Sequence, residues 1–233
     1  MKRRVFIAMH YMEIGGAEIS LIGLLQAMDY SQYDVDLFVY SHQGELMACI
    51  PEEVNLLPEV KEYSMIERPM RDALKAGCVR LVAARLVARW ANSRYLKRNR
   101  KEGTESGSVF GYIGKYVARV LPRINPAVEY DAAISFLAPH DIVLRNVRAR
   151  KKICWIHTDY SHVAINAGLE HPVWNGYDHI VSISEEVTRA FVGVFPALEK
   201  KIVEIENILS PEFVRRRSEE VDVSSELAEV GGV

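Results

Sequence analysis

The sequence of 233 residues has few cysteines and no long apolar run, and these absences exclude several classes of protein. Its three cysteines, Cys49, Cys78 and Cys154, lie far apart without Cys-x-x-Cys spacing, so reduced thiols are expected. No stretch of about 18 apolar residues occurs, and no membrane-spanning helix is predicted. The apolar stretch after the basic start is too short for a signal peptide and is followed by no small-residue cleavage site. We therefore expect a cytoplasmic protein.

The sequence also lacks an excess of either charge, with 29 lysines and arginines against 31 aspartates and glutamates. A formal net charge of −2 gives no global reason to expect a nucleic-acid partner, and none is predicted. Hydrophobic residues make up 49% and charged residues 26%, the balance of an ordinary globular protein. The length suits one large domain or two small ones.

Short apolar segments alternate with segments of helical periodicity along most of the chain. Strands are predicted at residues 5–9, 35–40, 54–57, 132–137, 152–157, 180–183 and 202–205. Helices are predicted at residues 17–28, 66–101 (one or two helices), 109–121, 141–147 and 185–195. Ser184 stands where it would cap the last of these helices. This alternation predicts an α/β protein with a doubly wound, mostly parallel sheet.

Two adjacent glycines, Gly15 and Gly16, separate the first predicted strand from the first predicted helix. Ligands of doubly wound sheets bind beyond the carboxyl ends of the strands, near this turn. Free amide groups and the helix dipole suit a phosphate or a sugar hydroxyl there. The dipole alone favours Glu18 in the first helical turn, so a plain tight turn is an alternative interpretation. The segment is not Gly-x-Gly-x-x-Gly and no acidic residue ends the second strand, which disfavours a dinucleotide enzyme.

Three motifs occur in a fixed order: GGAE at residues 15–18, IVSISEEVTRAF at 180–191 and VEIENILSPEF at 203–213. Together they resemble the N-terminal half of family-4 glycosyltransferases, and the resemblance covers most of residues 3–213. Ile208 and Ser210 stand where that family has glycine and aspartate. The resemblance implies the GT-B architecture, in which a Rossmann-like N-terminal domain binds the acceptor and a C-terminal domain binds the nucleotide sugar.

The resemblance also implies a division of the chain and an activity. Residues 1–213 would form the acceptor-binding domain, and residues 214–233 a linker or tail toward a nucleotide-sugar domain. That second domain would need well over a hundred further residues, so this chain alone is not expected to turn over. The implied reaction transfers a sugar, with retention of configuration, to a bacterial cell-surface polysaccharide or glycolipid.

The residues of the donor side are assigned by the same resemblance. Gly15, Gly16 and Glu18 would approach the donor diphosphate, and His157 would lie near the transferred sugar as the catalytic residue. His157 closes a buried apolar strand, so we expect it to open into the same crevice as the glycine turn. A histidine that is hydrogen-bonded locally is the alternative.

Acceptor contacts are expected from His10, which directly follows the first strand, and from Asp159 and His162 in the loop after His157. Solvated loop polarity is the alternative for Asp159 and His162, and simple strand termination is the alternative for an acceptor role of residues 136–140. Imidazole and carboxylate groups in the 157–162 loop could ligate a metal, but their loop spacing does not favour it. We predict no metal and no cofactor besides the nucleotide-sugar donor substrate.

The segment 66–101 is strongly basic, with Glu67 and Asp72 as its only acids. Its basic residues are Arg68, Arg71, Lys75, Arg80, Arg85, Arg89, Arg94, Lys97, Arg98, Arg100 and Lys101. Apolar residues are interleaved with them, so the segment predicts a cationic amphipathic helix. Such a helix could bind the inner, anionic surface of a membrane. A helix that packs its apolar stripe on the sheet and solvates its charges is the alternative.

Two other functions remain open from the sequence. A non-catalytic α/β module that binds a carbohydrate or a partner protein would share these motifs without turnover. A flavodoxin-like or epimerase-type nucleotide enzyme would bind its cofactor tightly through this chain alone.

Overall fold

The computed structural model describes residues 1–99, 105–209 and 215 of the chain, and these form a Rossmann-like α/β fold. Seven strands make one sheet in the order β3-β2-β1-β5-β6-β8-β9, and every neighbouring pair is parallel. The strands are β1 (Arg3–Met9), β2 (Tyr33–Val39), β3 (Asn55–Leu56), β5 (Tyr130–Ser135), β6 (Ala149–Ile156), β8 (His179–Ser182) and β9 (Ile202–Glu204). The predicted doubly wound sheet is confirmed, because strand order reverses direction between β1 and β5.

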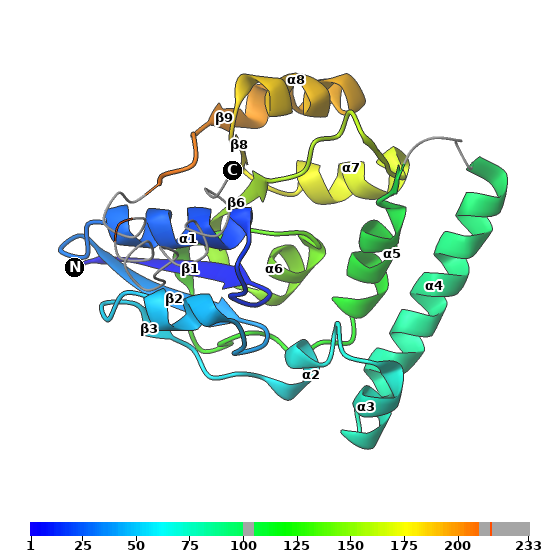
Figure 1. Ribbon diagram of the computed structural model, residues 1–233, viewed down its shortest axis with the longest axis horizontal. Helices are drawn as coiled ribbons and strands as arrows, with labels where there is room; N and C mark the ends of the chain where they lie inside the picture. Colours follow the sequence, from blue (N-terminus) through cyan, green and yellow to red (C-terminus); the bar gives the residue numbers. More distant parts are fainter. Residues whose placement is uncertain (100–104, 210–214, 216–233) are drawn as a thin grey trace, which may run out of the picture.

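Helices lie on both sides of this sheet (Figure 1). They are α1 (Gly16–Ala27), α2 (Lys61–Ser64), α3 (Met70–Lys75), α4 (Val79–Asn99), α5 (Ser108–Val117), α6 (Asp141–Asn146), α7 (Ala167–Asn175) and α8 (Glu185–Val194). Two 3₁₀ helices, η1 (Glu45–Cys49) and η2 (Pro196–Lys201), and a separate parallel pair of short strands, β4 (Glu105–Ser106) and β7 (Val163–Ala164), complete the described chain.

The continuous apolar run of β1 follows from burial on both faces of the sheet. Phe6 and Ala8 face one side, where they join a cluster with α4, α5 and α6. Val5, Ile7 and Met9 face the other side and pack with α1 and η1. A third cluster lies under α7 and α8 beside β6 and β8. A strand with both faces buried does not alternate apolar with polar residues, and the apolar run at residues 5–9 predicts such a strand.

The basic segment is two helices with a sharp break between them. Gly77 adopts a φ of +78°, a left-handed conformation that ends α3, and the backbone N–H of Cys78 returns to the carbonyl of Ala73 at 2.9 Å. Of the predicted span 66–101, residues 66–69 and 76–78 are not helical, and residues 100–101 lie outside the described part of the chain.

The predicted helix cap at Ser184 is confirmed. Its hydroxyl oxygen accepts a hydrogen bond from the backbone N–H of Val187 at 3.3 Å, and Glu185 and Glu186 occupy the first turn of α8. By contrast, α7 was not predicted from the sequence. Pro172 lies inside it, and the signal for its start was Asn166, whose side chain accepts from the N–H of Leu169.

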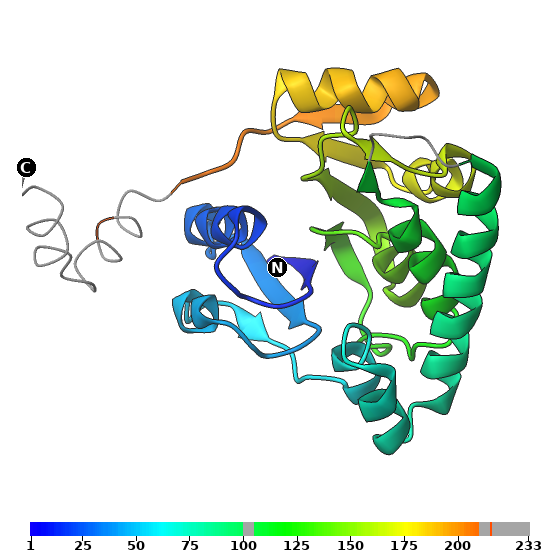
Figure 2. The same cartoon turned by 45° about the vertical axis from the view of Figure 1, so that its right-hand side comes forward.

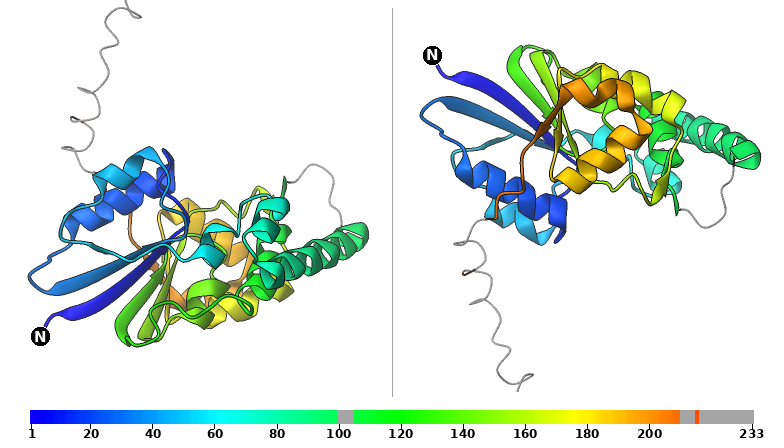
Figure 3. Two further views of the ribbon diagram at one scale, coloured as in Figure 1. Left: turned by 90° about the horizontal axis from the view of Figure 1, so that it is seen from below. Right: turned by 90° about the horizontal axis from the view of Figure 1, so that it is seen from above.

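The segment after β9 crosses back over the sheet to α1 (Figures 2 and 3). The Ser20 hydroxyl donates to Asn207 Oδ1 at 2.7 Å, and the carbonyl of Ile208 occupies the space that a Cβ at Gly23 would need. Gly23 is therefore required by close backbone approach. Of the motif at 203–213, Ser210 and Phe213 lie outside the described residues, as does nearly all of the predicted linker 214–233.

Among the described residues, no helix combines the length and the apolar character needed to cross a membrane.

Substituting Gly23 tests this close approach. Helix propensity alone would make Gly23→Ala stabilising by about 1 kcal/mol. We expect instead a loss of about 1–3 kcal/mol in the free energy of unfolding, because the added methyl group meets the Ile208 carbonyl. Gly193→Ala in α8 is the matched control, since its Cβ would meet no neighbouring atom. Urea unfolding measures both variants, and equal stabilisation of the two would show that residues 205–209 do not pack on α1.

Candidate functional site

Three histidines lie at the carboxyl edge of the sheet, around the switch point between β1 and β5. His10 directly follows β1, His140 precedes α6 after β5, and His157 directly follows β6. Burial is the main cause that lowers the pKa of His140 to about 3, and the charges of His157 and His10 contribute to this shift. His157 and His10 are therefore close enough to His140 to disfavour its protonation.

His10 is held by a carboxylate. Its Nδ1 lies 2.7 Å from Glu67 Oε1, and its ring stacks on Tyr40 with 4.8 Å between the ring centroids. Because a carboxylate only accepts, the proton of this hydrogen bond is on Nδ1. The hydrogen bond from His10 lowers the pKa of Glu67, burial opposes this shift, and the charges of His10 and Arg85 add to it. The carboxylate thus fixes the ring and leaves Nε2 as the free nitrogen.

His157 presents the same nitrogen at the same edge. Its ring centroid lies 4.7 Å from that of Phe136, and burial lowers the pKa of His157 to about 4. In the described parts of the chain, the buried side-chain nitrogens and oxygens without a hydrogen-bond partner are Nε2 of His10 and Nε2 of His157. A buried polar atom left unpaired costs about 1–3 kcal/mol, so two at one edge mark a place where a ligand could bind.

The glycine turn lies at the amino end of α1, where the sequence predicts it. Gly15 is the N-cap residue with extended backbone, and a Cβ at Gly16 would meet no atom within 4 Å. The Glu18 carboxylate folds back onto Gly15. Burial raises the pKa of Glu18, while its own backbone N–H and the charge of His10 act in the opposite direction. A diphosphate at this helix end would have to share the site with the Glu18 carboxyl group.

Asp159 and His162 lie in an exposed turn beyond β6. Asp159 Oδ1 accepts from the backbone N–H of Ser161 at 2.8 Å, and its Oδ2 lies 3.7 Å from Nε2 of His162. Hydrogen bonds from Ser161 lower the pKa of Asp159. The two predicted acceptor residues therefore face each other in solvent, and their role in acceptor binding stays a prediction.

Two cavities open at this edge of the sheet. One, of about 310 Å³, lies beyond β1 and β2 and is lined by His10, Tyr40, Glu67 and Arg68 among others. Arg68 is fixed there by a 2.8 Å hydrogen bond to Gln43 Oε1.

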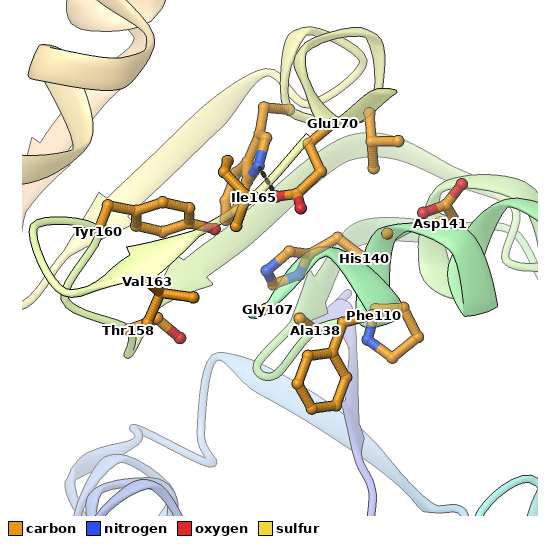
Figure 4. Close-up of a pocket in the computed structure, with 14 residues that line it drawn as sticks. Gly107, Phe110, Ala138, His140, Asp141, Thr158, Tyr160, Val163, Ile165 and Glu170 are labelled. Atoms are coloured by element: carbon orange, nitrogen blue, oxygen red, sulfur yellow. Dashed lines mark hydrogen bonds between the residues drawn. The ribbon is translucent and has the colours of Figure 1, made fainter. Parts of the chain in front are cut away.

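The other cavity, of about 190 Å³, lies beyond β5 and β6, between α5 and α7 (Figure 4). His140 lines it from the predicted 136–140 segment, whereas Phe136 is fully buried beneath His157. Gly15, Gly16 and His157 line neither cavity. The structure therefore brings the predicted residues to one edge of the sheet but not into one continuous hollow.

Within the described residues, no group of three or more histidine, cysteine, aspartate or glutamate side chains is placed to hold a metal ion. All three cysteines are free, and Cys78 and Cys154 are buried.

Two acidic residues that line these cavities, Glu67 and Glu170, are not among the site residues that the sequence predicts. Glu67 was noted only as an acid opposing the basic segment, although it supplies the partner of His10. Glu170 lies on α7, a helix that was not predicted. Sequence spacing gives no signal that Glu67 pairs with His10, because the two residues are 57 positions apart.

No family model matches the sequence, and no curated protein matches it. Two solved structures of Anabaena Alr3699/HepE are similar to this chain, one in complex with UDP-glucose and one with UDP and glucose. Each is 13% identical in sequence with a TM-score of 0.43, and each match covers 88% of this chain. The chain spans less than half of the length of these structures, 43% and 44%. The likeness is one of fold alone.

The buried state of His157 predicts a pH dependence of stability. A folded pKa of about 4, against about 6.5 when unfolded, means that the unfolded chain binds the proton first as pH falls. The contribution of neutral His157 is thus complete above about pH 6.5 and is lost toward pH 4. We expect the stability of the wild type relative to His157→Gln to fall over that range in urea unfolding. A difference that does not change with pH would contradict the burial of this imidazole.

Proposed function

We propose that this chain is the acceptor-binding, N-terminal half of a GT-B glycosyltransferase of the family-4 type. In this proposal the whole enzyme, with its nucleotide-sugar domain, transfers a sugar with retention from a nucleotide-sugar donor to a cell-surface polysaccharide or glycolipid, at the cytoplasmic face of a bacterial membrane. The motifs at residues 15–18, 180–191 and 203–213 support the family, and the doubly wound sheet is the fold it requires.

One observation carries the proposal: Nε2 of His10 and Nε2 of His157 are buried without partners at the carboxyl edge of the sheet. A neutral imidazole nitrogen accepts a hydrogen bond from a hydroxyl group, which is the group that a sugar acceptor presents. Fixing that hydroxyl next to the donor sugar converts a bimolecular reaction into an effectively intramolecular one. Glu67 positions His10 for this contact, and Phe136 packs against His157.

The donor side of the proposal uses the amino end of α1. Gly16 leaves its backbone open to a ligand, and the helix dipole favours a diphosphate there. Glu18 would have to be protonated or displaced when the diphosphate binds, and the raised pKa of Glu18 makes protonation easier.

The outer face of α4 supports a membrane contact in this proposal. Leu86, Val87 and Trp90 are 54%, 43% and 63% exposed, and the Arg94 guanidinium lies 5.7 Å from the Trp90 ring centroid. The helix contains no acidic residue. Arg85 does not belong to this face, because it is buried and donates to the carbonyls of Met65 and Arg68. An exposed row of apolar and basic side chains fits the headgroup region of an anionic bilayer.

Sugar transfer is the direct test of the catalytic role. The chain, supplied with a nucleotide-sugar-binding domain, is assayed with a panel of nucleotide sugars and with saccharide or lipid-linked acceptors. We expect His157→Ala to lower kcat by about 100-fold or more, since the acceptor loses a positioned nitrogen. His157→Gln, which keeps a polar side chain of similar size, shows whether any loss comes from misfolding. His179→Ala is the matched control, because His179 is exposed at the amino end of β8, away from the site. Unchanged kcat in both His157 variants would remove His157 from the site, whereas glycan binding without any transfer would favour a non-catalytic module.

Co-sedimentation with vesicles tests the membrane contact. The double variant Arg94→Glu and Lys97→Glu should bind vesicles of phosphatidylserine and phosphatidylcholine more weakly by about 2 kcal/mol or more, since each basic residue near the surface contributes about 1 kcal/mol. Trp90→Ala should also weaken binding, and Lys200→Glu in η2 should not. Equal binding to purely neutral vesicles would contradict this part of the proposal.

A further inference from the structure

The cavity between α5 and α7 has an apolar wall and one acidic group without a cationic neighbour. Phe110, Val163, Ile165 and Trp174 supply most of the wall. Its volume of about 190 Å³ is more than ten times the roughly 10–15 Å³ that one water molecule needs. The described residues that line it include no lysine or arginine.

Glu170 faces into this cavity between Tyr160 and His140, as Figure 4 shows. Trp174 Nε1 donates to Glu170 Oε2 at 3.5 Å, and this bond holds the carboxyl group against the indole ring. The pKa of Glu170 is raised to about 7, with burial as the largest cause. The charge of Asp141 acts in the same direction, and hydrogen bonds with Trp174 and Tyr160 act against it. No cation contributes to the environment of this carboxyl group among the described residues.

Asp141, the second acid of the cavity, differs in this respect. Burial is the cause that raises the pKa of Asp141, to about 6, and Arg119, Arg145 and Lys115 all act against this rise. Its charge is therefore partly balanced by the protein, whereas that of Glu170 is not. The third titratable group, His140, is neutral at pH 7 because burial lowers its pKa to about 3.

We propose that this cavity binds an organic ammonium ion, with the amine paired to the Glu170 carboxylate and the apolar body among Phe110, Ile165 and Trp174. A buried carboxylate without a counter-ion is costly, and a ligand cation would supply the missing charge. Aromatic rings within about 6 Å of a cation add further attraction. An anion is disfavoured by both acids. This inference rests on the cavity alone and is independent of the proposed glycosyltransferase function.

Benzylamine and benzyl alcohol are suitable probes, because they share size and ring and differ in charge. Isothermal titration of the full chain at about pH 8, where the amine is still protonated, should show benzylamine binding at least about tenfold more tightly than benzyl alcohol. Glu170→Gln keeps the side chain's size and should lose this preference, whereas Glu199→Gln, an exposed change of the same kind, should keep it.

The wild-type protein supplies a second readout that does not depend on folding of the variant. Benzylamine affinity should rise from about pH 6 to pH 8 as Glu170 ionises, while His140 stays neutral and Tyr160 stays protonated. Ionisation of Asp141 at the lower end of this range would add to the same trend. Equal affinity for the two probes, no binding of either, or an amine affinity that is unchanged by Glu170→Gln would each overturn the proposal.

Discussion

The parallel pairing of β1, β5 and β6 brings His10, His140 and His157 to one edge of the sheet, and burial there determines what they can do. In water each imidazole would gain a proton near pH 6.5. Burial lowers the pKa of His157 to about 4 and that of His140 to about 3. These two rings are therefore neutral at physiological pH, and a neutral ring can accept a hydrogen bond from a ligand hydroxyl.

Burial shifts the pKa of three acids at the same edge in the opposite direction: it raises the pKa of Glu18, Asp141 and Glu170. Both trends reduce the charge that the edge carries when no ligand is bound. A neutral saccharide could therefore contact His157 without meeting a charged imidazole, whereas beside His10 it would also meet the Glu67 carboxylate, whose pKa is lowered. A diphosphate or an ammonium ion would instead change the protonation of the carboxyl group that it approaches.

Much of the fold could be predicted from the sequence, because the carboxyl-terminal parts of β1, β2, β6 and β8 are buried, mainly apolar runs. The Ser184 cap followed from residue type and position alone. The contacts of the site could not be predicted in this way. Glu67 lies between α2 and α3 and meets His10 through tertiary contact, and Glu170 lies on a helix that contains Pro172. The packing of Ile208 on Gly23 likewise joins residues far apart in the chain, which no local pattern encodes.

In the proposed site, Nε2 of His10 and Nε2 of His157, both buried without partners, would bind one ligand. Imidazole ¹⁵N NMR of the protein, titrated first with methyl glycosides and then with nucleotide sugars, tests this most directly. We expect that one of these ligands shifts both Nε2 resonances along curves with the same Kd, because each nitrogen gains its missing partner. Shifts confined to one histidine, different Kd values for the two, or no shift with any of these ligands would contradict it.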